Sequence, residues 1–502
     1  MSFPHYFESF DYAQMLRDFP VDEPFTAGFA RASREQIREH QNRLFMRCVA
    51  RATEIPFYQR LWKNHGVKAA DIRSLDDLSR LPIFGKSDLM QSLAEHPPYG
   101  DYHGWDQWPI ENRPITVVHT TSGTTGRPQV VLFSPKSREV QALLVARIWR
   151  MQGLQPSDVI HSVYGHGMIN GGHFVREAAL HYTNCLFLSA GTGKETRSVT
   201  QIELMRDMRV TVLVGFVDYI RQLAETAREL GLEPGRDLPV RAILGHVGRE
   251  SRAALSRAWG GAEVYDWYGV ADTGPIAAEG PDRDGMYVME DAQYLELVDE
   301  NTGQLIDDEQ PGDMVVTSLY RDDVYPLIRF NTHDLSAWKF GKSTLDYTLR
   351  RTVGVLGRSD NMVKLRGINV YPLALAAILN DRPEFAGEYI CRATRDASGR
   401  DEMSVIIETR GAISARTPEL QQVFAELLTR RVGVDINTEL VAQGGTAALT
   451  QIDSRQKPVR LIDERRKAEP GGAATRERAQ RRGHERARAD RARSASRRGV
   501  LP

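Results

Sequence analysis

Cysteine is scarce in this sequence, which has three among its 502 residues: Cys48, Cys185 and Cys391. They lie far apart and form neither a CxxC pair nor a Cys/His spacing of the kind that binds zinc. Disulfide frameworks belong to oxidising compartments and need paired cysteines. The sequence therefore predicts no disulfide framework and no zinc site, and it fits a cytoplasmic location.

Long apolar runs are missing too. The longest ones, such as 210–217, are far shorter than the ~20 residues that a membrane-spanning helix needs. The first residues contain no basic segment followed by an apolar stretch, as a secretory signal would. We therefore expect a soluble, unprocessed protein with no membrane partner.

Net charge is almost absent, because 65 Lys and Arg stand against 66 Asp and Glu. This balance excludes a general attraction to nucleic acid or to an anionic membrane, so we expect small-molecule partners. Residues 468–502 are the exception, with ten arginines, four acidic residues and almost no large apolar side chains. Such a segment buries too little surface to fold, and we predict a disordered basic tail. A tail that binds a partner or nucleic acid stays open as an alternative.

After about 75 residues with a helical pattern, short apolar runs alternate with helical stripes. Residues 130–133, 210–214, 242–244 and 264–267 are strand-like, and helical patterns lie between them. Repeated βα units with apolar strands are typical of a largely parallel sheet covered by helices. The sequence predicts an α/β fold whose large N-terminal domain spans residues 1–359.

The pattern changes after residue 360 to that of a small α+β unit. Residues 403–408 are strand-like, and the apolar positions of 420–428 share one helix face. We predict a small C-terminal domain over 360–467, followed by the basic tail, 468–502.

The strongest local signal is the run of hydroxyls and glycines from His119 to Pro128. Glycines let the backbone approach an anion closely, and exposed N–H and hydroxyl groups can surround phosphate oxygens. The run lacks the GK[ST] ending and the following helix of a P-loop ATPase. Taken alone, it fits either a phosphate-binding loop or an ordinary Ser/Thr/Gly-rich turn.

Four further motifs follow in a fixed order. Residues 266–272 place an aromatic ring and a carboxylate at a strand end, where an α/β sheet normally holds its ligand. Residues 330–335 add a second carboxylate, suited to accept hydrogen bonds from ribose hydroxyls. Residues 357–372 and 454–460 add basic side chains. Each motif alone is a weak functional signal, but the motifs together are a strong one.

In this order the motifs resemble those of the adenylate-forming superfamily of acyl-CoA synthetases, peptide-synthetase adenylation domains and luciferases. Within it the sequence is similar to the phenylacetate-CoA ligase group, and residues 164–172 resemble the acyl-pocket loop of that group. The resemblance covers roughly residues 30–466. It implies a large N-terminal adenylate-forming domain with mainly parallel sheets covered by helices, a small mobile α+β C-terminal domain, and an ATP- and Mg²⁺-dependent acid:CoA ligase.

The resemblance also implies roles for single residues. It assigns catalysis to Lys457, Tyr268 and Arg358, the hinge to Asp360 and metal binding to Asp272. The residues that it implies for ATP and CoA are Thr120, Thr121, Ser122, Gly123, Thr124, Thr125, Gly126, Gly245, His246, Asp266, Tyr268, Gly269, Asp334, Arg358, Lys364, Arg366 and Gly367. Those that it implies for the acid are Tyr164, Met168, Ile169, Gly171, Phe216 and Gly245.

Two half-reactions follow from this resemblance. A carboxylate that attacks the α-phosphate of ATP brings two anions together, so the site needs a metal ion, hydroxyls and a lysine, which we expect to be Lys457. The second step needs a thiol instead of pyrophosphate, and a C-terminal domain turning about Asp360 would exchange Lys457 for 364–370. CoA is the implied acceptor; a carrier-protein thiol or an amine stays open, as does a homodimer.

Several positions depart from the family pattern. Gln129 stands where a lysine is usual, Ala271 and Asp272 replace a threonine and a glutamate, and Val247 lies in a stretch that usually carries a carboxylate. These changes raise an alternative enzyme, one that adenylates poorly but still converts a supplied acyl-adenylate to a thioester. A non-enzymatic paralogue that binds nucleotide, or a partner through its basic tail, is a second alternative.

The acyl pocket departs as well. Ile169 stands where the phenylacetate-CoA ligase group has an aromatic residue that packs on the substrate ring. The absence of this aromatic ring leaves more room for the acid in the pocket. With Tyr164, Met168 and Phe216 nearby, we predict a mostly apolar pocket for a bulky, aryl or alicyclic acid.

Overall fold

The structure is a computed structural model of the chain. It describes residues 6–121, 128–247, 252–299, 302–359, 363–365, 368–396, 400–411, 417–452 and 459–465. The chain forms two compact units, one of Met1–Met362 with Leu373–Asp381 and the other of Val363–Pro372 with Arg382–Pro502. The limits suggested by the sequence, 1–359, 360–467 and 468–502, stay a prediction.

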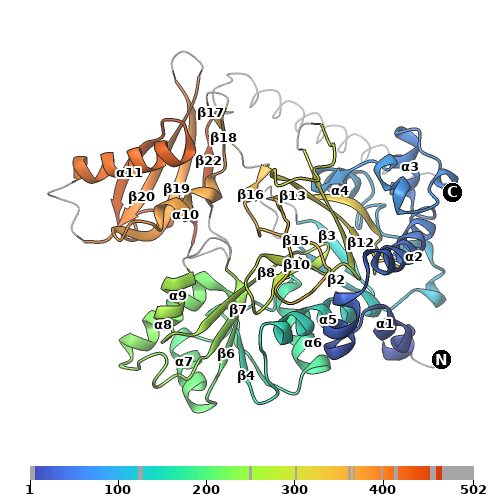
Figure 1. The fold of residues 1–502 in the computed structure, drawn as a ribbon, viewed down its shortest axis with the longest axis horizontal. Helices are drawn as coiled ribbons and strands as arrows, with labels where there is room; N and C mark the ends of the chain where they lie inside the picture. Colours follow the sequence, from blue (N-terminus) through green and yellow to red (C-terminus); the bar gives the residue numbers. More distant parts are fainter. Residues whose placement is uncertain are drawn as a thin grey trace, which may run out of the picture. The chain divides into compact units, whose positions relative to one another are not determined.

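The larger sheet of the first unit runs in the order β14-β15-β10-β9-β8-β7-β6-β4-β5 (Figure 1). Its strands are β4 (Val159–Ser162), β5 (Leu186–Ser189), β6 (Val212–Phe216), β7 (Ala242–His246), β8 (Glu263–Val270), β9 (Gly274–Glu279), β10 (Met286–Val288), β14 (Trp338–Lys339) and β15 (Arg351–Thr352). Strands β5, β4, β6, β7 and β8 are parallel, as the βα pattern predicts. The remaining pairs are antiparallel, because β9 returns from β8 after a short turn without a crossover helix.

A second sheet of the same unit has the order β1-β13-β12-β11, with β16 on β13, and β2 pairs separately with β3. The bounds are β1 (Phe84–Gly85), β2 (Val117–Thr120), β3 (Val130–Phe133), β11 (Gln293–Val298), β12 (Gly312–Ser318), β13 (Leu327–Ser336) and β16 (Gly357–Arg358). Apart from the parallel β1–β13 pair, the pairs of this sheet are antiparallel.

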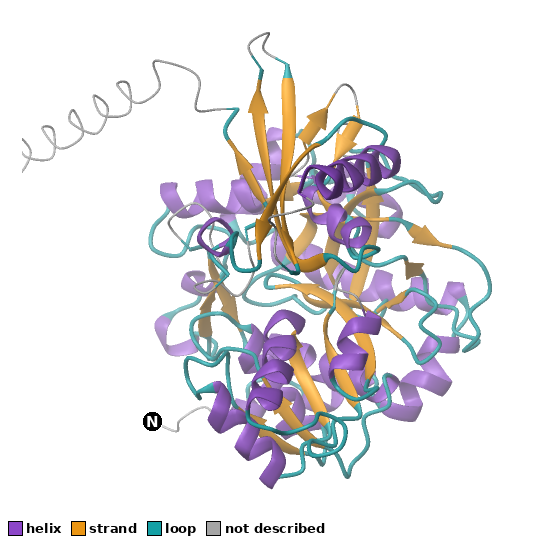
Figure 2. Ribbon diagram, turned by 90° about the vertical axis from the view of Figure 1, so that its left-hand side faces the viewer, coloured by secondary structure: helices purple, strands orange, loops and turns teal. Residues whose placement is uncertain are grey.

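Helices surround these sheets (Figure 2). They are α1 (Tyr12–Asp18), α2 (Arg34–Ala52), α3 (Pro56–Asn64), α4 (Lys86–Glu95), α5 (Pro135–Met151), α6 (Gly171–Tyr182), α7 (Ser198–Asp207), α8 (Val217–Glu229) and α9 (Arg252–Ala258). The short helix α10 (Leu375–Leu379) is also assigned to the first unit. Helix α5 begins where the Ser134 side chain accepts the N–H of Ser137 and Pro135 fills the first turn. It is buried on almost every face, and the polar side chains of Arg138, Glu139, Gln141 and Arg147 are buried along with its apolar ones.

Alternating side chains place the parallel strands in the middle layer. Val212 and Val214 of β6 pack in the same cluster as α5 and α6, whereas Leu213 packs with Ile220 and Leu223 of α8. Successive side chains of a strand point to opposite faces, so both faces of this part of the sheet are covered.

The second unit contains the sheet β21-β20-β19-β22 and the hairpin β17-β18. Its elements are β17 (Val363–Leu365), β18 (Ile368–Val370), β19 (Phe385–Arg395), β20 (Asp401–Thr409), α11 (Thr417–Val432), β21 (Asn437–Ala442), α12 (Ala447–Thr450) and β22 (Leu461–Asp463). Helix α11 contacts β21. This is the small α+β unit that the sequence predicts. Across the described parts of both units, no helix combines the length and apolar character needed to cross a membrane.

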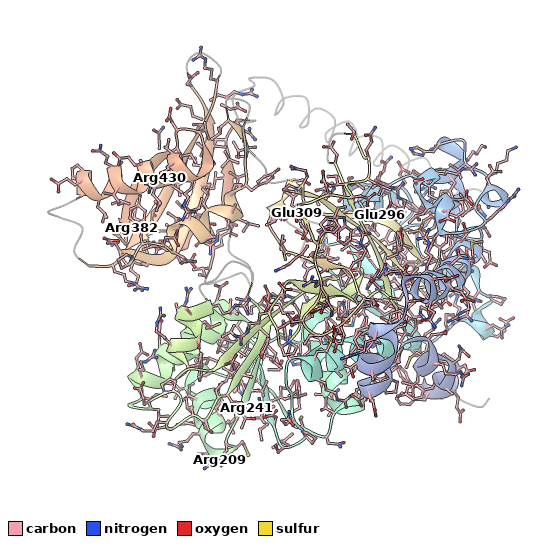
Figure 3. The ribbon with its side chains drawn as sticks, in the orientation of Figure 1. Arg209, Arg241, Glu296, Glu309, Arg382 and Arg430 are labelled. Carbon is pink, nitrogen blue, oxygen red and sulfur yellow. The ribbon has the colours of Figure 1, made fainter. Side chains whose placement is uncertain are left out.

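Buried ion pairs tie elements of the first unit together. Arg147 of α5 donates hydrogen bonds of 2.9 and 2.7 Å to Asp291, and its guanidinium lies 3.9 Å from the ring centroid of Phe25. Arg329 of β13 donates two bonds of 3.0 Å to Glu296 of β11, which Figure 3 labels. Breaking such a pair leaves a desolvated charge without its partner.

Replacing Asp291 with alanine should destabilise the protein by about 3–5 kcal/mol, because the buried Arg147 loses its carboxylate. The double variant Arg147→Met/Asp291→Leu should lose much less, since packed apolar residues often replace a buried pair without loss. Urea unfolding followed by tryptophan fluorescence measures both. The control Arg206→Ala removes an exposed pair with Asp207 and should change little. Equal losses in the single and double variants would contradict this account.

Candidate functional site

Four aromatic rings lie in a row at the carboxyl ends of the parallel strands. Phe216 ends β6 and pairs in register with His246, which ends β7; their rings stack with centroids 5.4 Å apart. Trp267 of β8 lies 4.1 Å from His246 on the other side. Tyr164, just after β4, meets Phe216 edge-on at 5.2 Å. We call these four residues the aromatic row, and it lies where parallel sheets hold their ligands.

Two glycines predicted from the sequence border this row. A Cβ on Gly245 would lie 2.2 Å from the carbonyl oxygen of Gly215, so β6 and β7 approach too closely for a side chain there. A Cβ on Gly171 would lie 3.8 Å from the ring of Tyr164. Residues implied for the nucleotide (Gly245, His246) and for the acid (Tyr164, Phe216, Gly171) therefore meet at one place.

The aromatic row contains polar atoms that the protein leaves unsatisfied. The hydroxyl of Tyr164 and Nε1 of Trp267 are buried and have no hydrogen-bond partner in the described part of the chain. Burial raises the pKa of Tyr164, and the charge of Asp266 raises it further, so the phenol stays protonated. An unsatisfied buried donor costs about 1–3 kcal/mol. Both atoms are suited to hydrogen-bond a ligand.

Tyr268, Asp334 and Arg358 meet at a junction of the two sheets. The Tyr268 hydroxyl donates to Oδ2 of Asp334 at 2.7 Å, and the Arg358 guanidinium donates to Oδ1 at 3.0 Å. Asp334 and Arg358 are register partners on β13 and β16. Burial and the charge of Asp334 raise the pKa of Tyr268. A carboxylate has two acceptor oxygens, which suits hydrogen bonds from a pair of ribose hydroxyls.

Asp272 is buried between β8 and β9. Its Oδ1 accepts hydrogen bonds from Nε2 of Gln129 at 2.6 Å and from the hydroxyl of Tyr325 at 3.0 Å. Burial raises the pKa of Asp272, while the Tyr325 bond, the charge of Arg321, the Gln129 bond and the charge of Lys86 oppose this rise. Gln129, which stands at the usual lysine position, thus holds the carboxylate that the sequence assigned to the metal.

Lys86 is a site residue that the sequence analysis missed. It begins α4 directly after Gly85, which pairs with Asn331 of β13. Its Nζ donates to Oγ1 of Thr121, at the start of the phosphate loop, at 3.0 Å. A lone lysine 34 residues before the loop carries no recognisable signal, because only the β1–β13 pairing brings it there.

Met168 acts through its backbone in this structure. Its side chain is 54% exposed, while its carbonyl accepts the N–H of Thr120 at 2.7 Å and lies 3.3 Å from Nδ1 of His119. The acyl-pocket loop thereby supports the start of the phosphate loop. Ile169 is partly buried. On β8, a Cβ at Gly269 would lie 2.5 Å from the Gly274 carbonyl oxygen, which explains the glycine.

Several predicted residues are not tested by the structure. Ser122, Gly123, Thr124, Thr125, Gly126, Asp360, Arg366, Gly367 and Lys457 lie outside the described residues. Lys364 is described only as backbone, in β17. Their roles stay predictions.

The described residues fit a magnesium ion that is shared with phosphate oxygens. Mg²⁺ is usually bound by one or two carboxylates together with substrate phosphates. The bonds that Gln129 and Tyr325 give to Asp272 both end on Oδ1, which leaves Oδ2 as the oxygen to face a metal. When bound, the ion would neutralise phosphate charge.

Comparison with known proteins agrees with this arrangement. The AMP-binding enzyme family matches residues 64–320, and the AMP-binding enzyme C-terminal domain matches residues 367–465. A phenylacetate-coenzyme A ligase of Thermus thermophilus is 30% identical, over 80% of this chain and 86% of its own. That of Aromatoleum evansii is 28% identical, over 79% of this chain and 88% of its own.

Solved structures give the same result. A 2-hydroxyisobutyryl-CoA ligase in the postadenylation state, in complex with R3-HIB-AMP, is 27% identical with a TM-score of 0.75, covering 87% of this chain and 91% of that one. The same ligase with 2-HIB-AMP and CoA, in the thioesterification state, is 27% identical with a TM-score of 0.61, covering 90% and 93%. On these matches, this chain belongs to the family of AMP-binding enzymes.

Proposed function

We propose that this enzyme, an ATP-dependent, AMP-forming acid:CoA ligase, activates an aryl or alicyclic acid that carries a polar substituent. One observation supports the site best: a cation, Lys86, donates to Thr121 at the start of the phosphate loop, and a carboxylate, Asp272, is bonded by Gln129 just after that loop. Lys86 follows strand β1, which pairs with β13, the strand that carries Asp334. Joining a carboxylic acid to ATP requires such compensation of negative charge.

In the first half-reaction, a carboxylate oxygen of the acid attacks the α-phosphorus of ATP, and the bond to pyrophosphate breaks. We propose that Asp334 and Arg358 hold the ribose and that Tyr268 lies near adenine and the acyl group. Lys86 and Thr121 are placed to meet the β- and γ-phosphates, where charge grows as pyrophosphate leaves. Lys457, by its motif, would bind at the α-phosphate.

In the second half-reaction, the sulfur of CoA attacks the acyl carbon, the thiol loses its proton and AMP leaves. We propose that Asp360 is the hinge for this step and that Lys364, Arg366 and Gly367 approach the thiol channel. A second state is needed because pyrophosphate and thiol cannot be served by the same groups at once.

We propose that adenylation is retained despite the departures at Gln129, Ala271 and Asp272. The shorter carboxylate of Asp272 is anchored by Gln129 and Tyr325, and Lys86 supplies a cation near it. The thiolation-only enzyme is the competing hypothesis.

The acid should hydrogen-bond as well as fill an apolar space. The aromatic row offers rings for a flat or bulky group, and the Tyr164 hydroxyl is a buried donor without a partner in the described chain. A hydroxyl or oxo oxygen on the acyl group would satisfy it. An acid without such an atom would leave the donor unpaired, and this selects against it.

Finer aspects also stay proposals. We place the enzyme in the cytoplasm, in line with its unpaired cysteines, Cys48, Cys185 and Cys391. A homodimer, and transfer to a carrier-protein thiol or an amine instead of CoA, are proposals that size-exclusion chromatography and acceptor competition would separate.

Acid-dependent exchange of pyrophosphate into ATP tests the first half-reaction. We expect exchange in the natural enzyme, and a loss of about 10²–10³-fold in Lys457→Ala, because a preorganised cation is removed. Conversion of supplied phenylacetyl-adenylate and CoA to thioester should change only a few-fold. The exposed Lys342→Ala is the matched control. Unchanged rates of both half-reactions in Lys457→Ala would refute the role of Lys457; thioester formation without exchange in the natural enzyme would favour the thiolation-only enzyme.

Replacing Lys86 with methionine should slow exchange about tenfold or more, because a cation at the leaving phosphates is lost. It should also move the acid limb of the exchange rate to higher pH. The Lys86 charge lowers the pKa of Asp272, so without it this carboxyl takes up its proton earlier as pH falls. A pH series of exchange rates measures both effects, with exposed Lys63→Met as control. An unmoved acid limb in Lys86→Met would argue against this pairing.

A Tyr164→Phe variant tests the polar acyl contact. We expect the natural enzyme to prefer one of the ring-hydroxylated phenylacetates over the methyl analogue of the same position, and the preference to fall about tenfold or more in the variant. Ratios of kcat/KM for ortho, meta and para pairs measure it. If all three hydroxyl-to-methyl ratios stay the same in Tyr164→Phe, the hydroxyl does not contact the acid.

A further inference from the structure

A polar cavity of about 260 Å³ lies in the first unit, between α2 and the strands β10, β11 and β14. Its lining residues are Arg34, Arg38, Gln41, Val288, Glu290, Tyr294, Leu295, Trp338 and Arg350. None of them belongs to the site described above. Arg34, Arg38 and Gln41 are spaced four and three residues apart, so one face of α2 forms a wall of the cavity.

Three guanidinium groups converge on the hydroxyl of Tyr294. Arg38 donates to this oxygen at 3.2 Å, and Arg34 and Arg350 line the same cavity as Tyr294. Guanidinium groups repel one another, so this grouping is stable only with anions nearby. Burial lowers the pKa of Arg350, and the charge of Glu290 opposes this shift.

The carboxylate in the lining is already occupied. Glu290 is 4% exposed, accepts two bonds from Arg34 at 2.6 and 2.7 Å, and also accepts the backbone N–H of Arg350 at 2.8 Å. It therefore pairs directly with Arg34, while its charge also acts on Arg350 without a hydrogen bond to that guanidinium. Arg38 pairs at the rim with Asp76, whose side chain is exposed and solvated.

Arg350 is held in place without a strong acceptor. Its guanidinium carbon lies 3.4 Å from the ring centroid of Trp338, which fixes its plane. The carboxylate paired with it, Asp307, lies at 3.7 Å and is exposed. Among the described residues its guanidinium makes no hydrogen bond within 3.5 Å, so its donors are available to a ligand.

From this geometry we infer a binding site for a phosphoryl group, in which Arg350 and Arg38 donate to phosphate oxygens and Tyr294 adds a hydroxyl. Planar guanidinium forks and a phenol match the oxygens of a phosphate monoester or pyrophosphate. The cavity is smaller than those that enclose a drug-sized ligand. It suits free phosphate, pyrophosphate or the phosphate end of a longer molecule such as CoA.

A bound anion would connect α2 to the sheet. Trp338, under Arg350, packs in the same buried cluster as Tyr268. The ligand would thus rest against a cluster that also contains a residue of the candidate nucleotide site. The inference is independent of the acid that the enzyme uses.

Calorimetric titration of the full-length chain, at constant ionic strength, tests the site with four probes: inorganic phosphate, pyrophosphate, CoA and dephospho-CoA. Arg350→Gln should weaken binding of the preferred probe about tenfold or more, because a charge-assisted bond is lost. Arg350→Lys should show a smaller loss, and Tyr294→Phe, which keeps every charge, a loss of a few-fold. Arg206→Gln is the matched control. If the protein binds CoA more tightly than dephospho-CoA and Arg350→Gln abolishes this difference, the 3′-phosphate of CoA is the group that binds. If Arg350→Gln weakens the binding of phosphate or pyrophosphate, the free anion is the ligand.

The nucleotide site also binds phosphates, and Lys86→Met separates the two contributions. It should weaken phosphate binding at the nucleotide site and leave the Arg350-dependent part intact. In phosphate-free buffer, the rate of thioester formation by Arg350→Gln should stay within a few-fold of the rate of the natural enzyme, which shows that this variant folds. If the rate falls further, the binding measured with Tyr294→Phe decides the test. The inference is overturned if Arg350→Gln and Tyr294→Phe bind the preferred probe as tightly as Arg206→Gln does. It is also overturned if none of the four probes binds at millimolar concentration.

Discussion

The hydrogen bond from Tyr268 to Asp334 is the contact on which the nucleotide-binding region depends, because it joins the two large sheets of the first unit. Tyr268 lies on β8 of the larger sheet and Asp334 on β13 of the smaller one. Arg358, paired in register with Asp334, fixes the second oxygen of the same carboxylate. Together with the bond from Tyr325 to Asp272, this junction sets the spacing between Asp272 and Asp334.

The same region shows how a buried carboxylate is kept usable. The burial of Asp272 favours its neutral form. Hydrogen bonds and two cations oppose this effect and favour the charged carboxylate. One of them, Arg321, is fully buried among the rings of Phe133, Tyr320 and Tyr325. The other, Lys86, reaches in from the start of α4. Placing cations around the carboxylate before substrate binds lowers the cost of bringing further negative charge to it.

The departures from the family pattern also have a structural consequence. The stretch around His246 loses a carboxylate, and the imidazole that stands there stacks between Phe216 and Trp267. The position thereby becomes part of an aromatic wall. In the cavity near Arg350, by contrast, an aromatic ring accompanies a charged group: the ring of Trp338 packs against the guanidinium of Arg350 and orients it.

The sequence by itself determined the βα alternation, the small α+β unit and the order of the motifs, because apolar periodicity and glycine placement are local properties of the chain. It also named Tyr268, Asp334, Arg358 and Asp272, although their joint geometry is long-range. Only the tertiary structure decided that Lys86 meets Thr121, that Gln129 bonds Asp272, and that Tyr164 and Trp267 keep unsatisfied donors. These depend on strand pairing and desolvation between residues far apart in the chain, and neither is encoded by the neighbours of a residue in the sequence.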